Sequence, residues 1–175
     1  MKEAQKSAVL SELKRFLCYV AVVAGGMLLI ITFVVQRADV YGRSMEPTLK
    51  DGDILLVDKL SYRFSAPRRY DIIVFSYRYQ EGRYYTKRII GLPGETVQIQ
   101  DGTVLVNGEP LKDDILSEPI EKARRASEPV VLGEDEYFVL GDNRNFSSDS
   151  RDTDVGNVKR RDIIGRIWLK VWPPG

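Results

Sequence analysis

Hydrophobic positions along this chain form one long run near the N-terminus and several short runs after it. From Phe16 to Val35 the sequence continues for 20 residues without a charge. At about 1.5 Å of rise per residue, such a helix spans a hydrocarbon core of about 30 Å. We therefore predict a transmembrane helix over residues 16–35, after a cytoplasmic segment over residues 1–15. A cleaved signal peptide is the alternative, but it requires a shorter apolar region and a small-residue cleavage site, which residues 36–39 do not offer.

The short runs that follow have the alternation and the branched and aromatic composition of β strands, and Gly, Pro or Asp bounds them. We predict strands over residues 53–58, 71–77, 84–90, 97–100, 103–106, 136–140 and 163–172. Asp101-Gly102 between two alternating segments is the strongest short-range signal of a hairpin. The charged stretch 112–128 has no sustained period and is expected to be a surface excursion with at most a helical turn. Residues 36–175 are thus predicted to form one all-β domain.

The composition of the chain excludes several kinds of partner and metal site. The net charge of +1 provides no basic surface for nucleic acid. The only cysteine, Cys18, lies in the apolar run, and the chain has no histidine, so neither an internal disulfide nor a Cys/His metal site is possible. No pattern organises the carboxylates into a metal site, and we predict no cofactor and no metal. A slight excess of Lys and Arg before the apolar run favours a cytoplasmic N-terminus.

Two residues are candidates for catalysis in a chain without histidine. Ser44 lies in a turn-rich segment, and a serine nucleophile here needs a base other than the usual imidazole. Lys87 lies in a predicted strand, where alternation places it on one face with Tyr85 and Ile89. A lysine is an effective base only if burial disfavours its charged form, because its ordinary pKa is about 10.4. Taken singly, each has a simpler interpretation, a turn-forming serine and a lysine that reaches solvent.

Three motifs in one order change this interpretation. Ser44 to Leu49, Lys87 to Glu95 and Gly141 to Arg151 together resemble the bacterial type I signal peptidases, membrane-bound serine-lysine proteases that remove signal peptides from exported proteins. The stretch 52–57 is similar to a structural strand of that family. The resemblance covers nearly the whole chain, and the shortness of 112–128 is typical of compact, single-span members. It implies a mainly β catalytic domain of antiparallel sheets behind one N-terminal transmembrane helix.

The resemblance also implies roles for individual residues. Ser44 would attack the scissile carbonyl, Lys87 would act first as general base and then as general acid, and Ser147 would orient the Lys87 amine. The expected supporting residues are Arg88, Asp142, Arg144, Asp149 and Arg151. Arg88 points away from Lys87 and is expected to pair with a carboxylate such as Asp149. Family substrates carry small residues at the first and third positions before the cut, and the matching pocket positions are Val40, Met45, Leu49 and Tyr85.

The same resemblance sets expectations for location and partners. The enzyme is expected in the plasma membrane as a single-pass protein, with its N-terminus cytoplasmic and its catalytic domain outside the cytoplasm. Its partners would be the signal peptides of preproteins, membrane lipid and the secretion translocase. Trp168 and Trp172 either touch the membrane interface, which tryptophan favours, or belong to the core or an edge strand.

One departure from the family pattern concerns the oxyanion. In part of the family the residue two before the nucleophile offers a hydroxyl, but here it is Gly42, so the backbone N–H of Ser44 must serve. One lost donor costs about 3 kcal/mol of transition-state stabilisation. Asn145 and Phe146 also differ from the commonest form of the third motif, at positions without a proton-transfer role.

Three alternatives remain. A self-cleaving repressor shares a serine-lysine dyad, but the membrane run replaces the DNA-binding helices that it would need. An organellar inner-membrane processing peptidase would share the motifs. A catalytically dead relative that acts as an assembly factor would be expected to lose the nucleophile or the base, and both are present.

Overall fold

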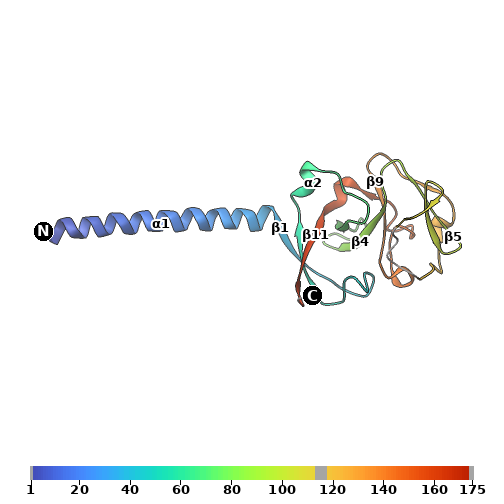
Figure 1. The fold of residues 1–175 in the computed structure, drawn as a ribbon, viewed down its shortest axis with the longest axis horizontal. Coiled ribbons are helices and arrows are strands. Elements are labelled where there is room, and N and C mark those ends of the chain that lie inside the picture. The colour runs from blue at the N-terminus through green and yellow to red at the C-terminus, as the bar shows by residue number, and fades with distance from the viewer. Residues whose placement is uncertain (1, 113–117, 174–175) are drawn as a thin grey trace.

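The computed structural model describes residues 2–112 and 118–173, and within helix α1 it describes side chains from residue 10 to residue 28. Helix α1 (Lys2–Phe33) projects from a body of β strands, as Figure 1 shows. Among the described residues, no helix is both long enough and apolar enough to cross a bilayer. The predicted span over 16–35 includes residues 29–33, whose side chains lie outside the described part.

Both predicted ends of this helix are displaced in the structure. The helix already begins at Lys2, because the Lys, Glu, Ala and Leu of the first segment are strong helix formers. The prediction that it continues to Val35 is wrong, since Val35 opens strand β1 (Val35–Asp39) and is paired there with Asp58. Only Val34 separates the helix from the strand. The sequence pattern missed β1 because its first residue, Val35, ends the apolar run and the other four residues do not show a strand pattern.

A seven-stranded antiparallel sheet makes up most of the β body. Its order is β1-β2-β11-β3-β4-β9-β10. Besides β1, its strands are β2 (Ile54–Asp58), β3 (Ile72–Ser76), β4 (Tyr84–Gly91), β9 (Glu136–Leu140), β10 (Val158–Lys159) and β11 (Ile163–Trp172). The predicted strands agree with β2, β3, β4, β9 and β11 to within a residue at each end.

A second, four-stranded sheet follows the order β7-β6-β5-β8. Its strands are β5 (Thr96–Gln100), β6 (Thr103–Val106), β7 (Glu109–Pro110) and β8 (Val130–Val131). β5 and β6 form the hairpin predicted around Asp101-Gly102, and both turn residues have positive φ angles. The other elements are short: α2 (Ser61–Phe64), η1 (Arg124–Ser127), η2 (Arg144–Phe146) and η3 (Arg160–Asp162).

The excursion predicted over 112–128 contains the helical turn η1 and includes residues 113–117, which lie outside the described part. The two sheets meet in a shared core. Val97, Ile99 and Val104 of the small sheet pack in one buried cluster with Ile90 of β4 and with Phe138 and Leu140 of β9. β4 and β9 therefore both contribute to this core. One carries Lys87 and the other leads into the third motif.

Candidate active site

Ser44 lies in a loop between β1 and β2. Backbone hydrogen bonds close the base of this loop, and its own apolar side chains pack into the core. Val40 N–H donates to Asp53 O at 2.9 Å, and Gly52 N–H donates to Val40 O at 2.9 Å. The side chain after Ser44, Met45, is 1% exposed and packs in a buried cluster. An apolar anchor next to the serine holds the hydroxyl at the surface of the core.

Lys87 reaches this serine from the middle of β4. Its Nζ lies 2.8 Å from Ser44 Oγ and donates to the carbonyl of Thr86 at 3.0 Å. The amine also lies over the ring of Tyr85, 5.3 Å from its centroid, which confirms that the two side chains share a face of the strand. Lys87 is 4% exposed. The structure thus joins the two residues that the sequence separates by 43 positions.

The ammonium form of Lys87 is disfavoured here. Burial away from water lowers the pKa of Lys87 from 10.5 to about 8, while the negative charges of Asp149 and Asp142 act in the opposite direction. Burial is the larger effect, because removing the charge from water costs more than two carboxylates that are engaged elsewhere give back. About a tenth of the amine is consequently neutral at pH 7, far more than for a lysine with its ordinary pKa.

The loop that follows β9 holds the backbone of Ser44. Asn143 N–H donates to Ser44 O at 3.0 Å, and Asn143 Nδ2 donates to Arg43 O at 3.1 Å. Gly141 lies against the same carbonyl, since a Cβ built on it would come within 2.5 Å of Ser44 O and 2.2 Å of Ser147 Oγ. Neither Asn143 nor Gly141 was assigned a role from the sequence. A glycine directly after a buried strand was the available signal.

Two buried ion pairs brace this loop. Arg88 donates to both oxygens of Asp142, at 2.8 and 2.6 Å. Arg151 donates to both oxygens of Asp149, at 2.8 and 2.9 Å, and to the carbonyl of Arg144. Arg88 thus pairs with a carboxylate as predicted, but that carboxylate is Asp142 and not Asp149. Arg88 is paired with Leu140 across the sheet, which brings Asp142, two residues further on, within its reach.

The family model described as "Signal peptidase, peptidase S26" matches residues 11–172. The chain belongs to the signal peptidase family. Signal peptidase I of Leptolyngbya laminosa is 43% identical over 149 residues, covering 81% of this chain and 71% of that protein. Signal peptidase I of Bacillus licheniformis is 36% identical over 153 residues, covering 83% and 81%.

A solved structure agrees with this assignment. The crystal structure of a signal peptidase I from Enterococcus faecalis matches with a TM-score of 0.50 and 36% identity, over 58% of this chain and 97% of that one. The resemblance inferred from the three motifs is confirmed, together with the mainly β antiparallel signal peptidase fold. The chain is accordingly an S26 peptidase of a family that is membrane-associated in bacteria.

The other predicted residues of this signal peptidase domain surround the dyad to different degrees. Asp142, Arg144, Asp149 and Arg151 are all buried in the loop beside it. Ser147 is 3% exposed, and its Oγ has no hydrogen-bond partner among the described residues. The contacts of Lys87 do not include it, so its orienting role stays a prediction. Among the described residues, no group of Cys, Asp and Glu side chains forms a metal site.

The predicted pocket positions fall into two places. Val40, Met45 and Leu49 pack together with Leu55 in one buried cluster next to the serine loop. Tyr85 lies instead on the face of β4, stacked on Tyr77 with ring centroids 4.9 Å apart. The three aliphatic side chains are at most 5% exposed. Their role in binding substrate stays a prediction.

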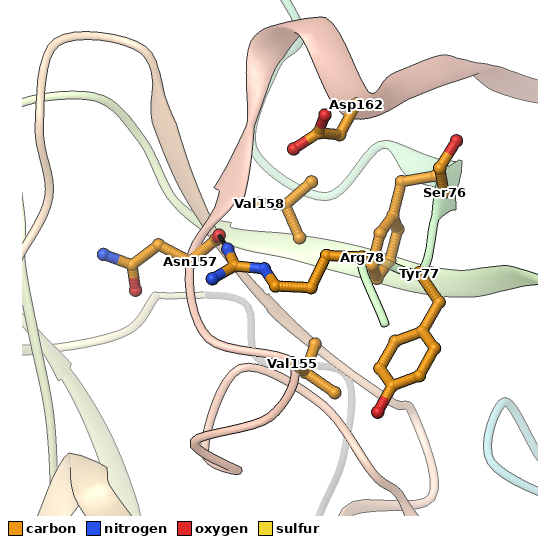
Figure 2. Close-up of a pocket in the computed structure, with 8 residues that line it drawn as sticks. Ser76, Tyr77, Arg78, Val155, Asn157, Val158 and Asp162 are labelled. Atoms are coloured by element: carbon orange, nitrogen blue, oxygen red, sulfur yellow. Dashed lines mark hydrogen bonds between the residues drawn. The ribbon is translucent and has the colours of Figure 1, made fainter. Parts of the chain in front are cut away.

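A separate small pocket lies where β3 ends. Figure 2 shows Arg78 reaching across it toward Asn157, with Val155 and Val158 along its wall. Arg78 Nη2 donates to Asn157 O at 3.3 Å. Its volume is about 10 Å³, room for about one water molecule. This pocket is too small to receive a side chain of a peptide substrate.

Proposed function

We propose that this member of the signal peptidase family is a serine endopeptidase that removes signal peptides from exported preproteins after small residues. Ser44 is the nucleophile and Lys87 the general base. The observation that carries the proposal is the buried Lys87 amine, 2.8 Å from Ser44 Oγ and outside every ion pair among the described residues. A base must lie within hydrogen-bond reach of the proton it removes, and this one does.

The proton balance follows from these contacts. The neutral amine of Lys87 takes the hydroxyl proton as Ser44 Oγ attacks the scissile carbonyl, and the resulting ammonium returns that proton to the leaving amine. Breakage of the peptide bond leaves an ester on Ser44. Water then attacks the ester while Lys87 accepts a proton from it. The ammonium returns this proton to Ser44 Oγ as the C–O bond breaks, and the cleaved signal peptide departs with a free carboxyl group. Burial keeps the amine ready for each transfer by lowering its pKa to about 8.

Ser147 completes the surroundings of this amine in the proposal. A neutral amine has two N–H groups and one lone pair. The lone pair faces the Ser44 hydroxyl and one N–H donates to Thr86 O, at 2.8 and 3.0 Å respectively. The buried Ser147 Oγ is the acceptor that we assign to the second N–H. The two ion pairs of the loop hold Ser147 in place for that contact.

The oxyanion is assigned to the backbone. The N–H of Ser44 has no partner among the described residues, whereas the N–H of Gly42 donates to Asp51 Oδ1 at 2.7 Å. Gly42 has φ +81°, a conformation that favours glycine. The N–H of Gly42 is thus already bound to Asp51, and the N–H of Ser44 is the donor that we assign to the oxyanion. For the substrate pocket we retain Val40, Met45, Leu49 and Tyr85, whose crowding accepts only small residues.

The finer location is also proposed. Helix α1 is the single membrane anchor, with residues 1–15 cytoplasmic and residues 36–175 outside the cytoplasm, where the secretion translocase delivers preproteins. Support comes from the uncharged stretch 16–35 and from the exposed apolar side chains of α1, such as Phe16 and Val23. Cys18, the only cysteine, is a direct probe. In intact membranes it should resist a membrane-impermeant maleimide and react after detergent is added. Equal labelling before and after would refute the anchor.

The dyad is tested with purified full-length protein and a preprotein bearing a signal peptide. Ser44→Ala should lower cleavage by about 10⁶-fold and Lys87→Ala by about 10² to 10⁴-fold. Ser148→Ala and Lys122→Ala are matched controls, because both side chains are exposed and Ser148 lies in the same loop as Ser147. The parent protein failing to cleave would favour the assembly-factor alternative. Unimpaired cleavage by either dyad variant would remove its residue from the mechanism.

A further inference from the structure

A basic cavity lies at the end of the β body where α1 enters. It has a volume of about 490 Å³ and is lined by Lys59, Arg63, Arg160 and Arg161 together with Tyr62, Ile163 and Ile164. No carboxylate lines it among the residues that the structure describes. Asp162 lies nearby, but its Oδ1 is 3.8 Å from Arg161 Nε and the Arg161 side chain is 77% exposed, which makes a weak pair. The cavity therefore concentrates positive charge.

The guanidinium of Arg160, at the wall of this cavity, is held in a fixed orientation. Arg160 donates through Nη2 to the carbonyls of Tyr62 and Ser65, and its guanidinium lies 5.4 Å from the centroid of the Tyr62 ring. Its Nη1 is buried and has no hydrogen-bond partner among the described residues. Neutral carbonyls orient this guanidinium without cancelling its charge. A preorganised charge of this kind suits an anion.

An apolar groove lies next to the basic cavity. Its volume is about 280 Å³, and Val34, Val35, Leu60, Phe64 and Trp168 line most of it. Phe64 is 83% exposed and Trp168 is 65% exposed, although both are large hydrophobic side chains. The groove also includes Asp58, whose charge is compensated by Arg166 at 3.3 Å and by Ser61. An exposed apolar surface at a polar rim marks an interaction site.

The short element α2 forms the ridge between the two concavities. Leu60 and Phe64 face the groove, while Tyr62 and Arg63 face the basic cavity. Both lie at the foot of α1: Val34, the last residue before β1, lines the groove, and its carbonyl accepts a 2.9 Å hydrogen bond from the N–H of Lys59 in the cavity. Figure 1 shows α2 on the side of the β body from which α1 departs.

We propose that these two concavities together bind one anionic membrane lipid, its phosphate in the basic cavity and an acyl chain along the groove. This inference rests on the proposed anchoring of α1, which would set the foot of the helix at the headgroup region. There, basic side chains attract the phosphate of an anionic lipid and tryptophan is favoured. A soluble anion would occupy only the basic cavity, and its binding would not account for the exposure of Phe64 and Trp168 in the neighbouring groove.

Trp168 reports on the groove once Trp172, the only other tryptophan, is replaced. The full-length Trp172→Phe protein is reconstituted into phosphatidylcholine bilayers that contain a minor fraction of brominated phosphatidylglycerol or, separately, of brominated phosphatidylcholine. Bromine quenches tryptophan fluorescence on contact. Quenching by the anionic lipid should exceed quenching by the zwitterionic lipid several-fold. Arg63→Gln with Arg161→Gln, both exposed in the structure, should remove most of that preference.

A matched control removes two charges elsewhere. Lys112→Gln with Lys122→Gln, two exposed lysines near the small sheet, should leave the preference unchanged. Equal quenching by the two lipids, or an equal loss in both double variants, would overturn the proposal. A preference that millimolar glycerol phosphate abolishes would assign the cavity to a soluble anion instead. Cleavage in detergent by the same proteins depends on the dyad, so failure of the lipid site and failure of the proteolytic function are distinguishable.

Discussion

Two adjacent cations on β4, Lys87 and Arg88, are both buried but in opposite circumstances. Arg88 is matched by a bidentate carboxylate, Asp142, and donates further to the carbonyl of Tyr70. Lys87 has a hydroxyl and a carbonyl as its partners. Strand alternation alone sends the two side chains to different faces. A shift of one residue in register would place the arginine beside Ser44 and the lysine beside Asp142, and the site would lose its base.

The difference shows how one strand provides both a scaffold and a reagent. A guanidinium stays charged in proteins and its planar fork matches a carboxylate, so Arg88 can fasten the Asp142 loop permanently. An ammonium loses its proton readily when buried, and only the lysine can then serve as a base. Removing one partner of the ion pair is therefore expected to lower stability, whereas removing the buried amine is expected to raise it. Four experiments test this contrast.

Replacement of Lys87 by Met should separate activity from stability most strongly. Cleavage should fall by about 10² to 10⁴-fold, because the general base is lost. The free energy of unfolding at pH 7 should rise by up to about 3 kcal/mol, since the lowered pKa of Lys87, about 8 instead of 10.5, measures the cost of burying its charge. Urea denaturation and peptide cleavage provide the two measurements. A less stable Lys87→Met protein would contradict the interpretation.

Replacement of Arg88 by Met should act in the opposite direction on stability. It leaves Asp142 buried without its partner, which should lower the free energy of unfolding by about 3 to 5 kcal/mol. Adding Asp142→Leu removes the stranded charge and should restore most of that loss. The double-mutant cycle by urea denaturation measures the coupling. Additive losses in the double variant would show that the two residues do not act as a pair.

The pH dependence should follow Lys87. Below pH 8, kcat/KM should rise about tenfold per pH unit as the ammonium loses its proton, and it should level off above, without a histidine-like step near 6.5. The pH dependence of the free energy of unfolding should also follow the titration of Lys87. Between about 8 and 10.5 the unfolded chain binds more protons than the folded one, so the free energy of unfolding rises with pH there. Lys87→Met should lose that rise.

Ser147→Ala should have the smallest effect and is the test of a positioning residue. We expect kcat to fall by about tenfold with little change in KM. The acid limb of the rate profile should also move to lower pH, because the lost acceptor stabilised the ammonium more than the neutral amine. Ser147→Thr, which keeps the hydroxyl, should restore the profile. A lower rate with an unmoved profile would indicate a role in packing only.

Local patterns predicted the elements of this protein well and the contacts between them poorly. The strands at 136–140 and 163–172 have the predicted bounds, because their branched and aromatic residues and the flanking turns are purely local signals. β1 was not predicted because Val35 belongs to the apolar run, and only its pairing with β2 identifies it as a strand residue. The site follows the same rule. Alternation placed Lys87 beside Tyr85, whereas the partner of Arg88 depended on the β4–β9 register, which no local pattern carries.

The Ser44–Lys87 contact itself was available only through family resemblance. Nothing in either motif specifies that a loop between β1 and β2 meets the middle of β4, since the register of several intervening strands decides it. The part played by Asn143 was hidden for the same reason. Its N–H fastens the carbonyl of Ser44 from 99 residues further along the chain, a contact between two loops with no periodicity.

The single residue between α1 and β1 limits the reach of the enzyme. Val34 offers one pair of rotatable backbone angles, and its carbonyl is already bound by the N–H of Lys59, so the joint cannot act as a swivel. A protease on a long flexible stalk could search for cleavage sites at many heights. With α1 as the proposed anchor, this enzyme would work at a height set by the length of its helix, and a preprotein would have to bring its scissile bond to that level.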